Sequence, residues 1–170
     1  MLLKGKKIVL GVTGGIAVYK AVDLVSRLRK QGAEVRVVMT EHARQFVTPL
    51  TFKEISGNAV ATSMWNSNQE FNAEHIALAN WADVFVVAPA TANIIAKMAH
   101  GLADDLLSTT LLAAQAPIIV CPAMNTGMYE NALTQENITC LKEHGVTMMP
   151  PAIGFLACGT SGAGRLPEPC

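Results

Sequence analysis

Residues 7–39 read KIVLGVTGGIAVYKAVDLVSRLRKQGAEVRVVM, and this stretch decides the fold class. The apolar run at 7–12 predicts a strand, and the apolar residues at helical spacing that follow it predict a helix over 18–30. Gly32 ends that helix, and the β-branched run at 34–39 predicts a second strand. A strand, a helix and a strand of these lengths form a right-handed crossover between two parallel strands.

The same alternation continues along the rest of the chain. Helices are predicted at 41–46, 49–56, 72–81, 92–100, 105–114 and 137–144, and strands at 83–88, 118–121 and 147–149. Because the strands are apolar throughout rather than at every second residue, we expect both faces of their sheet to be buried. The sequence therefore predicts a doubly wound α/β fold, Rossmann-like or flavodoxin-like, with helices on both faces of a parallel sheet in three α/β/α layers.

The length and composition of the chain allow one hydrophobic core. It has 170 residues, of which 51% are hydrophobic, and a single domain is predicted over residues 1–165. From residue 150 onward glycine, alanine and proline dominate, which predicts a mobile flap that carries Cys158. Residues 166–170 are typical of the start of an extended linker, so we expect the chain to be a piece of a longer polypeptide.

Charge and hydropathy exclude several classes of protein. The 13 basic residues balance 13 acidic ones, so binding of nucleic acid or of anionic lipid is not the expected function. No apolar stretch approaches the roughly 18 residues of a membrane helix, and the first residues lack the pattern of a signal peptide. The four cysteines form no C-x-x-C pair and have no histidines at metal-ligand spacing, which predicts no metal site and the reduced thiols of a cytoplasmic protein.

The loop GVTGGI at 11–16 lies between the first strand and the first helix. It places backbone N–H groups at a helix N-terminus, where such groups bind phosphate. Its spacing is G-x-x-G-G rather than the G-x-G-x-x-G of dinucleotide-binding folds, and Thr40 closes the second strand where a nicotinamide-binding fold has an acidic residue. These features favour a mononucleotide cofactor over a dinucleotide. The alternative is a tight turn that binds no ligand.

Three further segments carry candidate functional side chains. His75 falls in the first turn of its helix, where the helix dipole favours a neutral imidazole base; the alternative is an ordinary surface or capping histidine. Asn125 follows a strand and can donate an amide hydrogen bond to a carboxylate, while Met124 can lie against a flat aromatic ring; the alternative is an Asn turn beside core methionines. Cys158 and Arg165 place a thiol and a guanidinium on the glycine-rich flap, which suits a lid over a small acid.

Together these segments resemble the flavin-binding cysteine decarboxylase family. The resemblance covers nearly the whole chain and rests on GGIAVYK at 14–20, His75, PATAN at 89–93, PAMNTGMY at 122–129 and the flap at 157–165. The sequence departs from the family pattern at two positions. Thr91 stands where the family often has serine and Tyr129 where it often has tryptophan, and each substitution keeps a hydroxyl or an aromatic plane.

The resemblance implies an FMN-dependent enzyme of coenzyme A biosynthesis. Such an enzyme removes the cysteinyl carboxylate of 4'-phospho-N-pantothenoylcysteine and gives 4'-phosphopantetheine and carbon dioxide. The flavin first oxidises the thiol-bearing carbon to a thioaldehyde, which accepts the electrons left by carbon dioxide. The enethiolate is then reduced again by the flavin, so the cycle uses no external electron carrier.

The resemblance also implies roles for individual residues. His75 is the expected base or thiolate stabiliser, Asn125 holds the carboxylate, and Cys158 supplies a proton in the reductive half. The residues expected to line FMN are Gly14, Gly15, Ile16, Thr40, Pro89, Ala90, Thr91, Ala92 and Met124, with Thr40 and the glycine loop nearest the phosphate. The residues expected to contact substrate are Asn125, Met128, Ala157 and Arg165, of which Arg165 orders the flap over it.

Family members are trimers, which implies a homotrimer here, with a possible higher assembly of trimers, and with His75 and the flavin close to a subunit boundary. A CTP-dependent phosphopantothenate–cysteine ligase domain is expected to follow residue 170, and the enzyme is expected in the cytoplasm.

Other functions on the same scaffold stay open at this point. One is decarboxylation of a peptide C-terminal cysteine by a related flavin enzyme. Prenyl transfer to flavin is disfavoured by the Asn125 loop and the cysteine-bearing flap. A non-catalytic FMN-binding regulatory subunit typically has long acidic tails and no such thiol, and a nicotinamide-binding module is the most distant alternative.

Overall fold

The computed structural model describes residues 1–65, 74–159 and 161–168. Its centre is a parallel five-stranded sheet in the order β2-β1-β3-β4-β5. The strands are β1 (Lys7–Val12), β2 (Glu34–Met39), β3 (Val84–Ala90), β4 (Ile118–Pro122) and β5 (Thr147–Met148). This is the flavodoxin-like order, in which the chain adds β2 on one side of β1 and then continues on the other side.

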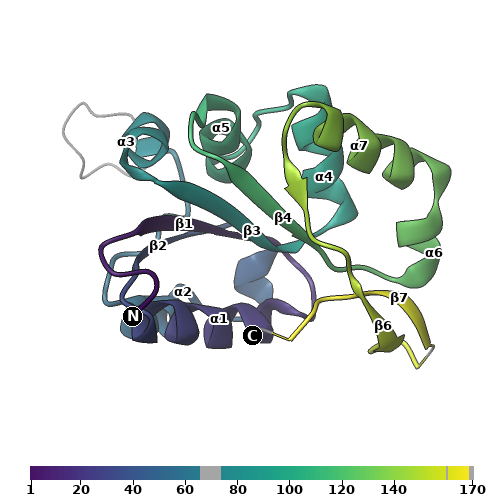
Figure 1. The fold of residues 1–170 in the computed structure, drawn as a ribbon, viewed down its shortest axis with the longest axis horizontal. Coiled ribbons are helices and arrows are strands. Elements are labelled where there is room, and N and C mark those ends of the chain that lie inside the picture. The colour runs from purple at the N-terminus through teal and green to yellow at the C-terminus, as the bar shows by residue number, and fades with distance from the viewer. Residues whose placement is uncertain (66–73, 160, 169–170) are drawn as a thin grey trace.

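Helices cover both faces of the sheet (Figure 1). One face carries α1 (Val18–Lys30) and α2 (Pro49–Ser56), and the other carries α3 (Glu74–Trp81), α4 (Ala92–His100), α5 (Leu106–Ala113) and α7 (Ala132–Glu143). Because the direction of winding reverses at β1, right-handed crossovers place the helices on opposite faces. The predicted three-layer α/β/α fold is confirmed.

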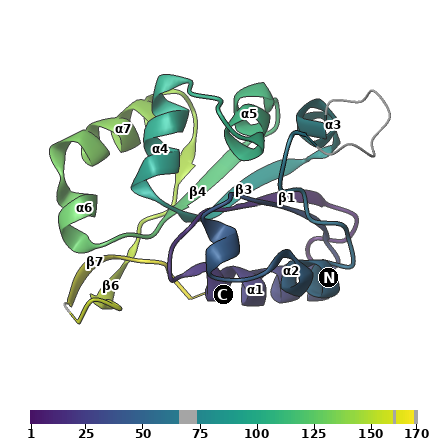
Figure 2. The same ribbon diagram turned by 180° about the vertical axis from the view of Figure 1, so that it is seen from behind.

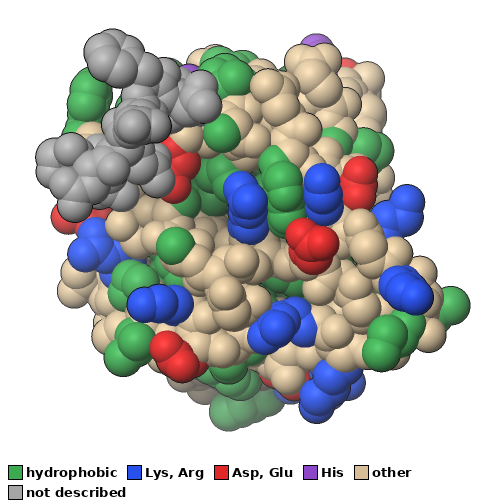
Figure 3. Space-filling model, turned by 90° about the vertical axis from the view of Figure 1, so that its left-hand side faces the viewer, with side chains coloured by type: hydrophobic (Ala, Val, Ile, Leu, Met, Phe, Trp, Pro, Cys, Tyr) green, Lys and Arg blue, Asp and Glu red, His purple; other side chains and the backbone are tan. Residues whose placement is uncertain are grey.

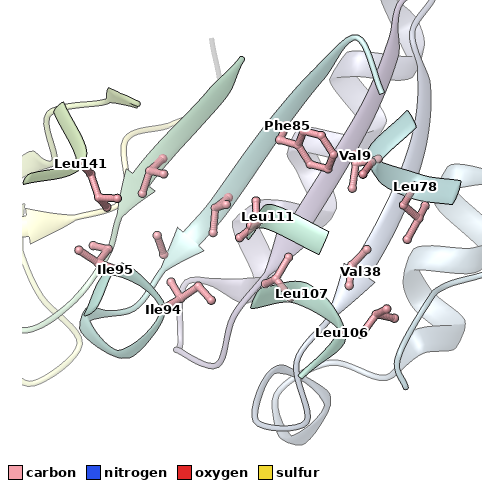
Figure 4. Close-up of a cluster of buried hydrophobic side chains, with 14 of the residues drawn as sticks. Val9, Val38, Leu78, Phe85, Ile94, Ile95, Leu106, Leu107, Leu111 and Leu141 are labelled. Carbon is pink, nitrogen blue, oxygen red and sulfur yellow. The ribbon is translucent and has the colours of Figure 1, made fainter. Parts of the chain in front are cut away.

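Two apolar clusters, one on each face of the sheet, hold the helices to the strands. Figure 4 shows the cluster that joins β1 and β3 to α5, with Phe85, Val9 and Leu107 pointing into it. Phe85 and Leu107 are each 1% exposed, and truncating such a side chain to alanine costs about 2–5 kcal/mol of stability. Gly11 permits this packing, because a Cβ atom there would lie 2.5 Å from Leu107 Cδ1.

Several element boundaries differ from the sequence prediction. β3 runs past residue 88 through Pro89 to Ala90, where it sits beside the end of β4. α7 begins before residue 137, because the Asn131 side chain accepts a hydrogen bond from the Leu133 N–H and caps the helix at Ala132. The helix predicted at 41–46 is a short 3-10 helix, η1 (Ala43–Gln45). Asn72, the expected N-cap of α3, lies outside the described residues.

The predicted flap contains a β-hairpin, which the sequence pattern did not indicate. β6 (Ala152–Phe155) and β7 (Ser161–Arg165) pair antiparallel. The hairpin lies beside α6 (Thr126–Glu130), a five-residue helix that the sequence pattern did not predict (Figure 2). Neither element produces a hydrophobic period, since α6 is a single short turn capped by Asn125 and the small residues of β7 bury little apolar surface.

The surface that faces the viewer in Figure 3 carries lysine, arginine and acidic side chains interspersed, with no extended area of one sign. A face of this kind has no strong field to attract a polyanion. Within the three described ranges, no helix combines the length and the hydropathy needed to cross a bilayer.

Candidate functional site

The candidate site lies at the carboxyl ends of β1 and β3. These strands are neighbours in the sheet, but the chain leaves them toward opposite faces, which opens a crevice between the two following loops. Ligands of doubly wound folds bind at this switch point, and in the flavodoxin-like order it lies between β1 and β3. The glycine loop follows β1, and Thr91 follows β3.

Thr13 joins the two loops, and the sequence analysis assigned it no role. Its hydroxyl donates to the Pro89 carbonyl oxygen at 2.6 Å and accepts from the Thr91 N–H at 3.0 Å. The side chain is 2% exposed, so both hydrogen bonds are shielded from water and are worth more than surface ones. Thr13 therefore sets the spacing between the loops that flank the crevice.

The glycine loop is shaped for close approach. A Cβ atom at Gly14 would collide with His42, whereas a Cβ atom at Gly15 would project into open space. Among the described residues, no group accepts a hydrogen bond from the N–H of Gly14, Gly15 or Ile16. These N–H groups lie just before α1, and the Thr91 side chain caps α4 by accepting from the Ile94 N–H. Two helix N-termini thus face one crevice, an arrangement that favours an anion.

Two adjoining cavities make up the crevice. The first has a volume of about 360 Å³ and the second about 710 Å³. Gly14, Thr91, Ala92 and Met128 line both. The second cavity is the more polar, with hydroxyl groups contributed by Thr40, Thr62 and Ser63, among others. One elongated ligand can therefore place a polar end in the second cavity and an apolar end in the first.

Most of the expected cofactor residues line these cavities. Gly14, Gly15, Ile16, Thr91, Ala92 and Met124 line the first, and Thr40 lines the second. Pro89 and Ala90 line neither, since both are buried at the end of β3. The Pro89 carbonyl instead accepts the Thr13 hydrogen bond, so its part in the site is to hold the loops.

Asn125 and Cys158 meet in the first cavity. The Asn125 side chain accepts from the Gly127 N–H at 2.8 Å through Oδ1, which caps α6. Its Nδ2 donates to Cys158 Sγ at 3.4 Å. Because the cap occupies Oδ1, the amide is held with its N–H groups toward the thiol. Met128, Ala157 and Arg165, the other expected substrate residues, line the same cavity.

The hairpin that carries Cys158 is held to the sheet by its second strand. The Met124 N–H donates to the Gly164 carbonyl oxygen at 2.9 Å. Gly164 has φ of 125°, and a Cβ atom there would collide with the Met124 carbonyl oxygen. Only glycine allows this approach, which places Cys158 opposite Asn125.

The segment after β7 contacts α1 through a buried lysine, which the sequence analysis also missed. Lys20 Nζ donates to the Leu166 carbonyl oxygen at 2.8 Å and to Glu168 Oε1 at 2.7 Å. Arg165 Nη2 lies 2.7 Å from the same Glu168 oxygen. The hydrogen bond from Lys20, supported by Arg165, holds the pKa of Glu168 below its usual range. No local pattern in the sequence predicts this contact.

His75 is not brought to the other candidate catalytic residues within one chain. It lies in the first turn of α3, half-buried, and it lines neither cavity of the crevice. Its neighbour Glu74 has a pKa raised by burial. Asn125 and Cys158 therefore form a pair in this chain, and His75 lies apart from them.

Comparison with known proteins identifies the family. Residues 2–169 match the model of the flavoprotein family. The chain belongs to the flavoprotein family. Over 169 residues this flavoprotein is 52% identical to the coenzyme A biosynthesis bifunctional protein CoaBC of Haemophilus influenzae, a match that covers 99% of the chain and 42% of the relative. The chain thus spans less than half the length of that relative.

Two solved structures resemble this flavoprotein closely. A PPC decarboxylase mutant complexed with pantothenoylaminoethenethiol is 34% identical, with a TM-score of 0.85, and the match covers 98% of this chain and 93% of that one. The FMN-dependent cysteine decarboxylase SpaF is 35% identical, with a TM-score of 0.83 and coverage of 95% and 91%.

Proposed function

We propose that this chain is an FMN-dependent carboxy-lyase that converts 4'-phospho-N-pantothenoylcysteine to 4'-phosphopantetheine and carbon dioxide in coenzyme A biosynthesis. The observation that carries the proposal is the contact between the Asn125 amide and the Cys158 thiol in a cavity continuous with the glycine loop. The similarity to CoaBC and to PPC decarboxylase supports the choice of substrate.

The crevice suits FMN. The N–H groups of the glycine loop and the Thr40 hydroxyl supply donors for a phosphate, and the space beside Gly15 is open. Ala92 and Met124 offer apolar and polarisable surface for a flat ring in the first cavity. When bound, FMN accepts an electron pair from the substrate and returns it before the product leaves.

Asn125 and Cys158 provide the polar chemistry on the substrate side. Asn125 presents a neutral hydrogen-bond donor to the substrate carboxylate. A positively charged donor would stabilise the carboxylate anion and so oppose the loss of carbon dioxide. In this proposal the thiol of Cys158, which accepts a hydrogen bond from that same amide, donates a proton to the substrate after decarboxylation. One amide thus orients both the leaving carboxylate and the proton donor.

His75 acts, in this proposal, across a subunit boundary of a homotrimer. Two features support an assembly: His75 lies apart from the cavity of its own chain, and apolar side chains are exposed beside it and at the glycine loop, with Ile76 44% and Ile16 60% exposed. Contact between subunits would cover such side chains.

We further propose that residues 1–165 are the decarboxylase domain of a cytoplasmic bifunctional enzyme. Its second part is a CTP-dependent phosphopantothenate–cysteine ligase domain after residue 170. The proposal is supported by the 42% of the Haemophilus influenzae relative that the chain covers.

A second candidate is decarboxylation of a peptide C-terminal cysteine, which is favoured by the similarity to SpaF. Mass spectrometry separates the two. The FMN-loaded protein should remove carbon dioxide from 4'-phospho-N-pantothenoylcysteine and leave a peptide ending in cysteine intact; the opposite result would reverse the assignment. A colourless preparation that cannot be reconstituted with FMN would overturn both.

A further inference from the structure

Three charged side chains meet where the hairpin joins α1. Glu168 Oε1 lies 2.7 Å from Lys20 Nζ and 2.7 Å from Arg165 Nη2. Lys20 and Arg165 both line the first cavity, next to Leu166. Figure 1 shows this end of the chain beside α1. A single carboxylate oxygen therefore bridges two cations at the wall of the cavity that holds Asn125 and Cys158.

The burial of the lysine separates this cluster from an ordinary surface ion pair. Lys20 is 5% exposed, whereas Glu168 is 67% exposed. A buried ammonium needs an anionic partner, because the loss of hydration is otherwise uncompensated. Two of its three N–H donors bind acceptors, and within residues 1–65, 74–159 and 161–168 the third has no acceptor, so it can bind a ligand. Counting the described residues only, two cations contact one carboxylate in this cluster.

The length of β7 is comparable with the length of the proposed substrate. Cys158 lies between the strands of the hairpin, and Arg165 lies at the far end of β7 from it. The four residue steps from Ser161 to Arg165 span about 13 Å of strand. In an extended phosphopantothenoyl arm, roughly 11 bonds separate the phosphorus from the cysteinyl Cα, which is also about 13 Å.

We propose that Lys20 and Arg165 form the subsite for the 4'-phosphate of the substrate, and that the Glu168 carboxylate occupies this subsite until the phosphate displaces it. The inference rests on the proposed function, since it takes the substrate from there. It assigns the FMN phosphate to the other side of the crevice, at the glycine loop and Thr40. The subsite explains how one pocket selects a phosphorylated substrate through residues that take no part in the chemistry.

The test compares two substrates on the FMN-loaded protein: 4'-phospho-N-pantothenoylcysteine and the same compound without phosphate. Lys20→Met should lower kcat/KM for the phosphorylated substrate about tenfold to a hundredfold and leave kcat/KM for the other substrate within about twofold. Because Arg165 is also expected to order the flap, Arg165→Met should lower kcat/KM for both substrates, but about tenfold more for the phosphorylated one. Lys30→Met, at the exposed far end of the same helix, is the matched control and should change neither value.

Glu168→Gln separately tests whether the substrate phosphate displaces the Glu168 carboxylate. Because Glu168 is exposed, this variant should fold even if Lys20→Met does not. It should lower KM for the phosphorylated substrate and strengthen inhibition by inorganic phosphate. An equal loss on both substrates in Lys20→Met and Arg165→Met would overturn the subsite and leave the cluster as a structural contact.

FMN binding provides the other decisive measurement. If the variants lose FMN but keep riboflavin, the cations hold the cofactor phosphate and the inference is wrong. Activity of the wild-type protein distinguishes failure of the phosphate subsite from failure of the proposed function. If the wild type decarboxylates both substrates, the proposed function holds, and the variants then test the subsite alone.

Discussion

Asn125 combines two tasks in one side chain, and a single-atom change separates them. Its Oδ1 caps α6 and its Nδ2 contacts Cys158. Aspartate also caps helices well, so Asn125→Asp keeps the cap but replaces the donor with a negative charge that repels the substrate carboxylate. We expect decarboxylation to fall at least about a hundredfold, measured as carbon dioxide release, with FMN still bound.

The matched control is Asn131→Asp. Asn131 caps α7 in the same way, by accepting from the Leu133 N–H at 3.0 Å, but it lines neither cavity of the crevice. This variant should keep full activity. Loss of FMN from Asn125→Asp would mean that the residue contacts the cofactor rather than the substrate.

Cys158→Ala should divide the reaction. Since the proposed role of the thiol is to donate a proton after decarboxylation, carbon dioxide should still be released while 4'-phosphopantetheine fails to accumulate. Mass spectrometry of the product checks this, and Cys140→Ala in α7 is the control. Normal yield of the reduced product from Cys158→Ala would remove the thiol from the mechanism.

Thr13 holds together the loops that follow β1 and β3. Its replacement should therefore weaken the binding of FMN. Thr13→Val leaves the Thr91 N–H without its side-chain partner and removes a donor from the Pro89 carbonyl. We expect a loss of about 1–3 kcal/mol in stability and weaker retention of FMN, measured by denaturant unfolding and by flavin release on dilution.

Thr110→Val is the control for the loss of a buried threonine hydroxyl. Thr110 is also buried, and its hydroxyl donates to the Leu106 carbonyl oxygen within α5, away from the glycine loop. It should change stability without releasing FMN. Equal FMN retention in Thr13→Val and wild type would show that the spacing of the loops does not depend on this residue.

At the scale of the whole molecule, the position of His75 leads to a test of assembly. His75→Asn and Cys158→Ala should each fail to form 4'-phosphopantetheine when expressed alone. If His75 serves the site of a neighbouring subunit, random mixed trimers carry both native residues at about a quarter of their sites, and co-expression should restore product formation. If each site instead needs His75 and Cys158 from the same chain, the co-expressed variants should form no product.

Stability toward alkaline pH is also a property of the whole molecule. Burial raises the pKa of Cys121, in β4, from 9.0 to about 11. The folded protein then holds a proton that the unfolded chain releases, so the stability provided below pH 9 should decline as the pH rises toward about 11, by no more than about 3 kcal/mol. Urea unfolding across this range should show a smaller decline for Cys121→Ala than for wild type or Cys140→Ala.

Much of the fold could be predicted because its signals are local. α1, α2 and α4 begin and end where the pattern places them, since apolar period and turn residues act over a few positions. The glycine loop and Asn125 were singled out because special residues follow buried strands, and Cys158 because it is a thiol on a glycine-rich segment. α6 and the hairpin were not, because a cap by Asn125 and pairing between small residues give no hydrophobic period.

The amino-acid sequence by itself determined the order of strands and helices along the chain, the burial of both faces of the sheet and the chemistry available at the strand ends. Only the tertiary structure decided which of those groups meet. Thr13 reaches Pro89 across 76 positions and Lys20 reaches Glu168 across 148, while His75 stays away from Asn125 and Cys158. Hydrogen bonds and ion pairs form between groups that are close in space, and these groups can be far apart in the sequence. Local sequence patterns therefore do not predict such contacts, which form only when the sheet brings the loops together.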